Sequence, residues 1–297
     1  MIATARGVTK RYGRATALDD ITFTLREHTI YGLLGRNGAG KTTLMQMLTG
    51  QNFPTSGEVT VFGSAPYEND AVLTDLCFVK ENQRYPDSFT VGHAVRAGAL
   101  LFPRWDAEFA QSLVDDFGLP RRRRVKKLSR GMVSALGCII GLASRSPLTF
   151  FDEPYLGLDA VARQLFYDRL LADYADHPRT IVLSTHLINE VGDLIEHVLL
   201  LDQGRLVVDQ DAETLRGEAV TVTGPAEAIE KLSQFRDELH RDRVGATTRV
   251  TLRGRFDAAD RAQADTLGLD VQPVSLQQLV VHLTGKHAAP LEKEPSR

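Results

Sequence analysis

The stretch GRNGAGKT, Gly35 to Thr42, decides the fold of this chain. It matches GxxxxGK[ST], in which the glycines let the backbone curl so that several N–H groups point at phosphate oxygens. The run TIYGLLG that leads into it has the composition of a buried strand, and KTTLMQMLTG from Lys41 has the pattern of a helix that Gly50 ends. A strand, a glycine-rich turn and a helix in this order predict a P-loop, so we expect a nucleotide site here.

The whole loop is predicted to contact the nucleotide. Lys41 is expected to reach the β- and γ-phosphates and to serve in catalysis, and the hydroxyl of Thr42 to bind Mg²⁺. A chance glycine-rich turn is the alternative, and the strand and helix on either side argue against it. The other predicted contacts are Gly35, Arg36, Asn37, Gly38, Ala39, Gly40 and Thr43.

Two further segments place polar side chains at the ends of buried strands. In FFDEP, Phe150 to Pro154, successive residues of the strand diverge, so we expect Asp152 to face Mg²⁺ and Glu153 to polarise an attacking water. An acidic pair at a strand end is often only a solvated edge, but a P-loop needs an acidic partner for its metal. His186 follows the strand-like run TIVLS. It is predicted to sense the γ-phosphate rather than to cap a helix or to be a surface histidine without a function.

Composition and segment order predict an α/β protein with more than one part. The chain has 297 residues, 43% of them hydrophobic, and a net charge of -3, which suits one large domain and a smaller one. The runs PLTFFDE and RTIVLSTH are separated by a helix-like segment, the pattern of parallel strands joined by a crossover helix. A hairpin is predicted about Gln203 and Gly204, and short β and α segments follow from about residue 216.

These patterns divide the chain into predicted domains. We expect an ATP-binding domain over 1–212, with a helical subdomain inserted at about 85–147, an accessory α/β domain over 213–286 and a flexible tail over 287–297.

The sequence also restricts where the protein can act. Cys77 and Cys138 lie in apolar surroundings without metal-type spacing, which favours buried, reduced thiols in a cytosolic protein. No apolar run approaches the roughly 18 residues that cross a bilayer, and the first residues lack the apolar region of a secretory signal. We therefore expect any membrane role to come through a partner.

The basic run RRRRVKK, Arg121 to Lys127, has two interpretations. Nucleic-acid binding is one, but the net charge is slightly negative and no aromatic residues are interleaved for base stacking. A solvated rim of the helical subdomain near the membrane surface is the favoured interpretation.

A P-loop alone is compatible with a kinase, a GTPase or a motor. A second motif distinguishes among these classes of P-loop protein. KKLSRGMVSALG places Ser129 and Gly131 at the start of a helix of small and apolar residues, which suits an anion. LSRGM before DEP, GLD (Gly157 to Asp159) after it and His186 downstream together resemble the ATP-binding cassettes of ABC transporters. The resemblance covers residues 1 to about 212 in the expected order.

The resemblance implies a fold and a shared site. It implies a P-loop NTPase with a RecA-like core, an antiparallel β subdomain and the inserted helical subdomain. Two cassettes would hold ATP and Mg²⁺ head to tail, with Ser129 and Gly131 of one cassette on the γ-phosphate bound by the other. Tyr12 would stack on adenine, rather than serve only in packing, and Asp159 would lie at the dimer interface.

One position departs from the family pattern. The family has a glutamine in the loop that enters the helical subdomain, and counting from LCFV or SFTV places Glu81 there, with Gln83 two residues later. A glutamate can approach Mg²⁺ but adds negative charge. The sequence therefore leaves open whether Glu81 or Gln83 has the coupling role of this loop.

The resemblance also implies a function. We expect an ATPase subunit of an ABC transporter that lies in the cytoplasm, on the inner face of the membrane, and drives a separate transmembrane permease. Its second cassette would be an identical chain or a paralogue. The ending VSLQQLVVHLTG looks like that of exporters of drugs, antibiotics or lipids. A non-transport ABC ATPase acting on ribosomes or DNA is the alternative, but heptads and a second P-loop are absent from the sequence; no nucleic-acid partner is expected.

Overall fold

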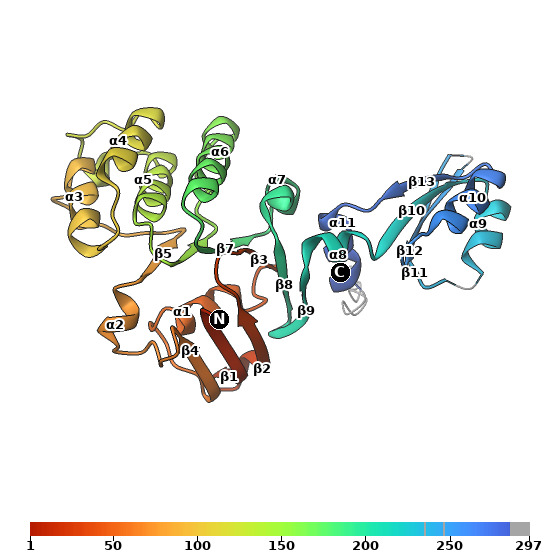
Figure 1. The fold of residues 1–297 in the computed structure, drawn as a ribbon, viewed down its shortest axis with the longest axis horizontal. Coiled ribbons are helices and arrows are strands. Elements are labelled where there is room, and N and C mark those ends of the chain that lie inside the picture. Colours follow the sequence, from red (N-terminus) through yellow and green to blue (C-terminus); the bar gives the residue numbers. More distant parts are fainter. Residues whose placement is uncertain (235, 246, 286–297) are drawn as a thin grey trace, which may run out of the picture. The chain divides into compact units, whose positions relative to one another are not determined.

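The computed structural model describes residues 1–234, 236–245 and 247–285, and its contacts divide the chain into two compact units (Figure 1). The first unit comprises Met1–His186 and Asp193–Asp209, and the second comprises Leu187–Gly192 and the chain from Gln210 onward. The sequence suggested a division after residue 212 but did not suggest that Leu187–Gly192 belongs with the later residues. The predicted tail, 287–297, lies outside the described residues.

A six-stranded sheet forms the centre of the first unit. Its strands, in order, are β5 (Leu76–Lys80), β6 (Leu148–Asp152), β7 (Thr180–Thr185), β3 (Ile30–Leu34), β8 (His197–Asp202) and β9 (Arg205–Asp211). All pairings from β5 to β8 are parallel, as predicted. Every residue of β3, β6, β7 and β8 is buried, because other elements cover both faces. The predicted hairpin is present between β8 and β9: Gln203 and Gly204 have φ of 46° and 79°, which suits a two-residue turn.

An antiparallel sheet packs on this core. It is formed by β1 (Ala3–Tyr12), β2 (Ala15–Leu25) and β4 (Ser56–Val61), in the order β2-β1-β4. One apolar cluster joins it to the helix α1 (Lys41–Leu48) and to the central sheet, through residues such as Leu25, Leu44 and Phe150. The short helix α2 (Asp70–Leu73) leads into β5.

A group of helices lies between β5 and β6 in the sequence (Figure 1). It comprises α3 (Val91–Leu101), α4 (Ala107–Asp116), a 3-10 turn (Val125–Lys127) and α5 (Arg130–Ala143). Side chains of Thr90, Asp106 and Ser129 cap the three helices, and each accepts a hydrogen bond from a first-turn N–H. Arg121–Arg124 are all exposed, as the interpretation of a solvated rim required.

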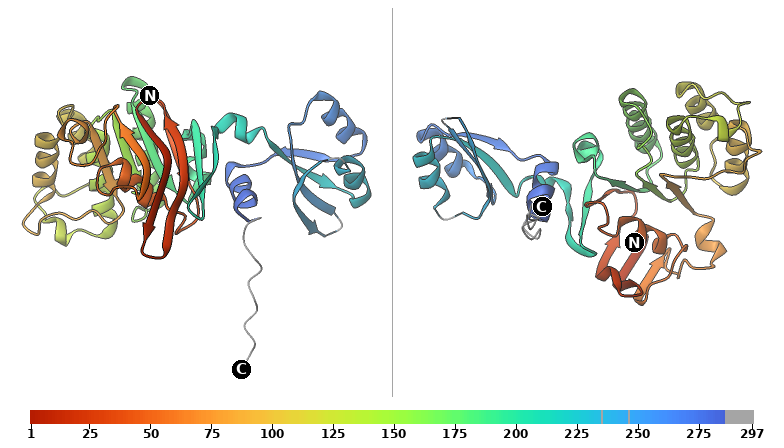
Figure 2. Two further views of the ribbon diagram at one scale, coloured as in Figure 1. Left: turned by 90° about the horizontal axis from the view of Figure 1, so that it is seen from below. Right: turned by 180° about the vertical axis from the view of Figure 1, so that it is seen from behind.

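The second unit contains a ferredoxin-like βαββαβ arrangement (Figure 2). Its elements are β10 (Ala219–Gly224), α9 (Ala226–Ser233), β11 (Glu238–Val244), β12 (Thr247–Arg253), α10 (Ala258–Thr266) and β13 (Asp270–Pro273). The sheet order is β11-β12-β10-β13 and all three pairings are antiparallel. Residues Ile229 of α9 and Ala264 of α10 enter the same core as Val222 and Val250, so both helices cover one face of the sheet.

Four more helices complete the described chain. The helices α7 (Ile188–Val191), α8 (Ala212–Arg216) and α11 (Leu276–Gly285) pack together in the second unit, and a 3-10 turn, Gly192–Leu194, leads back to the first. The helix α6 (Ala160–Asp176) is the crossover between β6 and β7. Among the residues that the structure describes, no helix is long and apolar enough to cross a membrane.

The two cysteines have the environment that the sequence predicted. Cys77 and Cys138 are both free and buried. Burial raises the pKa of Cys77 to about 12 and raises that of Cys138 as well, so both thiols are protonated and unreactive at neutral pH.

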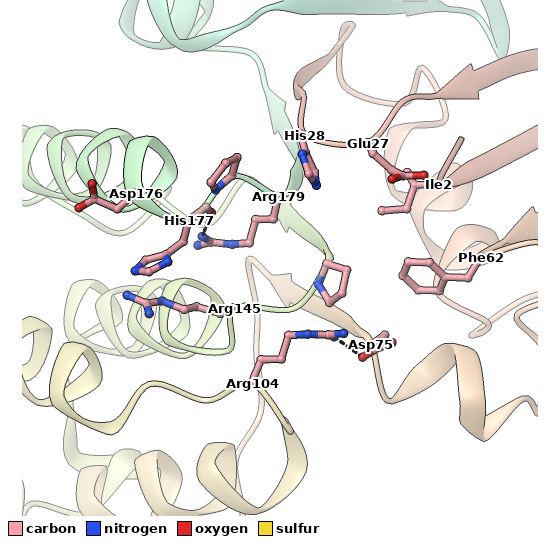
Figure 3. A pocket seen from close by; sticks show the side chains of 12 residues that line it. Ile2, Glu27, His28, Phe62, Asp75, Arg104, Arg145, Asp176, His177 and Arg179 are labelled. Atoms are coloured by element: carbon pink, nitrogen blue, oxygen red, sulfur yellow. Dashed lines mark hydrogen bonds and ion pairs between the residues drawn. The ribbon is translucent and has the colours of Figure 1, made fainter.

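Arg145 and Arg179, which line the cavity drawn in Figure 3, belong to a buried charge network that ties the inserted helices to the core. Asp173 of α6 accepts hydrogen bonds from Arg145 (2.8 Å) and Arg179 (2.7 Å), and Arg145 also pairs with Asp106, the cap of α4 (2.8 Å). Arg179 extends the network by donating to the carbonyl oxygen of Leu142 in α5. Both arginines line a cavity of about 700 Å³ beside Pro147 and Pro178, residues that precede β6 and β7.

Removing the shared acid should destabilise the first unit strongly. Asp173→Ala leaves two arginines, one of them fully buried, without their common counter-ion, a change that typically costs about 3–5 kcal/mol. We expect a clear fall in the urea midpoint, followed by the fluorescence of Trp105, the only tryptophan in the chain. Asp176→Ala, an exposed position on the same helix, is the matched control and should change stability by less than about 0.5 kcal/mol. Equal midpoints for the two variants would contradict this account.

Candidate nucleotide-binding site

The P-loop has a backbone that only glycine can form at three positions. Gly35, Gly38 and Gly40 have φ of 147°, 82° and 106°, in the region that side chains disfavour. A Cβ on Gly35 would lie 2.4 Å from the carbonyl oxygen of Leu201, so the loop also packs too tightly there for any larger residue. The helix α1 begins at Lys41, immediately after this curl, as the sequence predicted.

Lys41 is buried inside the curl of the loop, with 6% of its surface exposed. Its Nζ donates to the carbonyl oxygens of Gly35 (2.8 Å) and Arg36 (3.2 Å) and lies 3.7 Å from Oε1 of Glu153. Burial lowers the pKa of this amine, while the carboxylates of Glu153 and Asp152 oppose the shift. A cation is therefore held at the centre of the loop, where phosphate groups would replace carbonyl oxygens as its partners.

Thr42 and Asp152 meet at the junction of α1 and β6. The Thr42 hydroxyl donates to Oδ2 of Asp152 at 2.8 Å. Burial raises the pKa of Asp152, and the hydrogen bond from Thr42 opposes the shift. A hydroxyl and a carboxylate that already touch are hard oxygen donors of the kind that Mg²⁺ prefers, so the residues present fit this metal.

Glu153 and His186 form a second pair beside the first. Oε2 of Glu153 lies 3.0 Å from Nδ1 of His186, and the Glu153 side chain is 13% exposed. The backbone of Glu153 has φ of 47°, a left-handed conformation that is strained for a non-glycine residue and turns the side chain toward the loop. The ends of β3, β6 and β7 thus bring together a cation, two carboxylates and an imidazole.

These groups surround a pocket of about 610 Å³. Its lining includes the predicted residues Asn37, Gly38, Gly40, Lys41, Thr42, Thr43, Glu81, Asp152, Glu153 and His186. It also includes Ala17 and Leu156, which the sequence analysis missed. No sequence motif identifies Ala17 as a pocket residue. Its contact with the P-loop is a packing constraint, since its carbonyl oxygen would lie 2.8 Å from a Cβ on Gly40.

Four predicted contacts of the chain's own nucleotide lie outside the lining of this pocket: Tyr12, Gly35, Arg36 and Ala39. Tyr12 is half-exposed at the end of β1, and its hydroxyl accepts a hydrogen bond from Asn52 at 2.6 Å. Arg36 and Ala39 line a smaller cavity of about 150 Å³ with Asp202 and Gln203, and the side chain of Ala39 is buried. The roles of these residues remain predictions, and any part of Ala39 in phosphate binding would have to come from its backbone.

The second motif, LSRGM, lies at the start of α5. Ser129 caps this helix, with its Oγ accepting from the N–H of Met132 at 3.2 Å, and is itself exposed. Gly131 packs against the GLD segment, since a Cβ there would lie 2.6 Å from the carbonyl oxygen of Gly157. Asp159 caps α6 by accepting from the N–H of Ala162 at 2.9 Å. Each residue therefore has a structural role within the chain, in addition to any role toward a partner.

The structure separates the two candidates for the loop after β5. Glu81 lies at the nucleotide pocket and pairs with Arg130 of LSRGM, with 2.6 Å between Oε1 and the guanidinium. Gln83 instead lines an apolar pocket with Tyr85 and Phe89. Sequence reasoning treated the extra charge of Glu81 in isolation and missed that Arg130 neutralises it.

Comparisons with known proteins agree with this geometry. Residues 18–156 match the model of the ABC transporter family. The chain is 30% identical to the Nod factor export ATP-binding protein I of Mesorhizobium japonicum over 306 residues, which cover 94% of this chain and 86% of that protein. It is 29% identical to the bacitracin transport ATP-binding protein BcrA of Bacillus licheniformis over 203 residues, which cover 67% of this chain and 66% of that protein.

Solved structures show the same fold. The ATP binding subunit of an ABC transporter superposes with a TM-score of 0.66 at 23% identity, over 73% of this chain and 92% of that one. A dimeric ATP-binding cassette in a post-hydrolysis state, bound to ADP and Pi, superposes with a TM-score of 0.62 at 20% identity, over 71% of this chain and 99% of that one. The predicted P-loop NTPase fold is confirmed. The chain belongs to the ABC transporter family, as an ATP-binding subunit that hydrolyses ATP.

Proposed function

We propose that this chain hydrolyses ATP in a site completed by a second cassette and thereby drives a separate membrane-spanning exporter subunit. The observation that carries the proposal is the convergence of Lys41, Thr42, Asp152, Glu153 and His186 on one pocket. A transition state with negative charge spread over phosphoryl oxygens needs this combination of cation, metal ligands and a group that orients water.

The residues divide the chemistry among them. The N–H groups of the P-loop and Lys41 bind the phosphates of ATP. Thr42 and Asp152 would hold Mg²⁺, which would supply positive charge to the phosphate oxygens. Glu153 accepts a hydrogen bond from the attacking water and orients it. His186 holds the carboxylate of Glu153 through its 3.0 Å contact, and we expect it to contact the γ-phosphate as well.

The second cassette supplies the other wall of the site. Ser129 is exposed at the N-terminus of the fourteen-residue helix α5, whose positive dipole end favours a phosphate. Since Ser129 does not line the pocket of its own chain, we propose that it acts on ATP bound by another chain, with Gly131 and Asp159 beside it. An identical chain is the simplest partner.

The proposed direction of transport, which is export, is inferred from the names of relatives. Proteins named for Nod factor export and for bacitracin transport align with this chain, the first over 94% of its length. We propose an exporter of antibiotics, lipids or similar amphiphiles, with a transmembrane permease as the partner that holds the chain at the inner face of the membrane. Action on ribosomes or DNA is the less favoured alternative.

Replacing Glu153 tests the proposed chemistry. Glu153→Gln keeps a hydrogen-bonding side chain but removes its charge and basicity, so ATP binding should persist while turnover falls at least about 100-fold. Phosphate release and ATP affinity measured on the same preparation check both parts. Glu108→Gln, at an exposed position of α4, is the matched control and should turn over normally. Turnover like that of the unmodified chain in Glu153→Gln would remove Glu153 from its role.

Replacing Glu81 tests the loop after β5. Glu81→Gln removes the charge that pairs with Arg130 while the P-loop stays unchanged, so ATP affinity should stay within about threefold but ATPase coupled to transport should change. Gln83→Ala, two residues later, should alter neither quantity much. A damaging Gln83→Ala together with a silent Glu81→Gln would assign the coupling role to Gln83.

Crosslinking tests the shared site. A disulfide requires Cα atoms within about 7 Å, so Asn37→Cys with Ser129→Cys should give an interchain bond under mild oxidation with ATP, and much less without it. Asn37 is chosen because it is exposed at the pocket. Cys77 and Cys138 can stay because both are buried. Glu153→Gln is added to hold the ATP state.

The readout is a dimer band on a non-reducing gel, and Asn37→Cys with exposed Ser64→Cys is the control pair. A bond within one chain, or none with ATP, would contradict the identical partner. A bond that forms only after a different cassette is added would replace the homodimer with a heterodimer.

A further inference from the structure

We propose that the second unit positions His186 by capping the short helix α7, and that Gln277 and Arg216 are positioning residues for ATP hydrolysis. The inference rests on the proposed role of His186 beside Glu153. It assigns a control function to the part of the chain that follows the cassette.

The helix α7 cannot be stable by itself. It has four residues, Ile188–Val191, and starts two residues after His186. The side chain of Leu187, at its N-cap position, provides no capping hydrogen bond. Because nucleating a single turn is unfavourable and its terminal N–H and C=O groups lack partners within the helix, the order of α7 must come from elsewhere.

Both ends of α7 are capped by side chains of the second unit. At the first turn, the N–H of Asn189 donates to Oε1 of Gln277 in α11 at 3.4 Å. At the other end, the guanidinium of Arg216 in α8 donates to the carbonyl oxygen of Gly192. These two contacts supply one acceptor and one charged donor where the helix lacks its own.

Apolar packing reinforces the caps. Val191 is fully buried and Ile188 is nearly so, and α11 packs against α7 and α8. The same helix is anchored to the ferredoxin-like sheet, since the ring of His282 in α11 stacks on His240 of β11 with centroids 4.8 Å apart. A change in the sheet of the second unit therefore has a contiguous path to α7 through α11.

The path ends at the proposed catalytic pair. His186 is joined to α7 through Leu187 alone, and its Nδ1 lies 3.0 Å from Glu153, so we infer that the order of α7 limits the positions that the imidazole can take. No residue of α7 belongs to the P-loop or to the lining of the nucleotide pocket. Loss of the caps should therefore lower kcat and leave the KM for ATP nearly unchanged. Because a smaller folded fraction would give the same division, kcat is expressed per chain that binds ATP, so that a loss of folded chain does not lower it.

Side-chain replacements at Gln277 test this in the full-length chain. Gln277→Met removes the acceptor at nearly constant size and should lower kcat at least about fivefold, with the KM for ATP within about twofold. Gln277→Glu keeps an acceptor and should retain at least about half of the kcat. Arg216→Met should resemble Gln277→Met. The matched controls are Gln263→Ala and Arg261→Ala on exposed faces of α10, which should behave like the unmodified chain.

A double-mutant cycle separates this inference from the proposed function. If Gln277 acts through His186, adding Gln277→Met to His186→Ala should not lower kcat further. An undiminished kcat in His186→Ala would overturn the role of His186. A low kcat in His186→Ala with an unaffected Gln277→Met, or with fully additive losses, would overturn the positioning role alone. Trp105 fluorescence checks that the first unit of every variant is folded, and far-UV circular dichroism checks the second unit, which contains Gln277 and Arg216.

Discussion

The burial of one ammonium group, that of Lys41, constrains the rest of the nucleotide site. A buried cation needs oxygen partners on every accessible side, and the loop carbonyls of Gly35 and Arg36 supply only part of them. The carboxylates at the end of β6 must therefore approach from the other side. This requirement sets the positions of the carboxyl ends of β3 and β6 relative to each other, although the two strands are not neighbours and β7 lies between them. Burial of the amine, strain at Glu153 and the contact of Thr42 with Asp152 are thus parts of one arrangement.

Local motifs predicted this centre well because their geometry is set by nearby sequence. GRNGAGKT dictates its own curl, and FFDEP and TIVLSTH end on the same edge of a parallel sheet, so Asp152, Glu153 and His186 had to meet there. The boundary of the accessory unit was not predictable in the same way. Leu187–Gly192 has no sequence signal that assigns it to residues beyond 210. It belongs with them because α7 packs against α11, with added hydrogen bonds to Gln277 and from Arg216, residues distant in the chain.

The same distinction explains the two residues that sequence reasoning described incompletely. Glu81 looked like an uncompensated charge, because its partner Arg130 lies in another motif and the two meet only in the folded chain. Gly131 looked like a residue reserved for a partner's phosphate, yet contact with Gly157 already explains why it is small. Motifs report the chemistry of a site, whereas contacts between motifs depend on packing that no single motif encodes.

The packing of Gly131 on Gly157 has a consequence for how such a protein can change over generations. A Cβ on Gly131 would lie 2.6 Å from the backbone oxygen of Gly157, whereas a Cβ on Gly157 would first meet a side chain, with Oγ of Ser134 2.7 Å away. A clash with a side chain can be relieved by a later replacement with a smaller one, but a clash with backbone offers no such second step. Substitution of Gly131 therefore cannot be compensated by a later change in a neighbouring side chain, whereas the contact at Gly157 could be relieved in part at Ser134. Gly131 should stay glycine even in a descendant that has lost its partner cassette and no longer needs ATP.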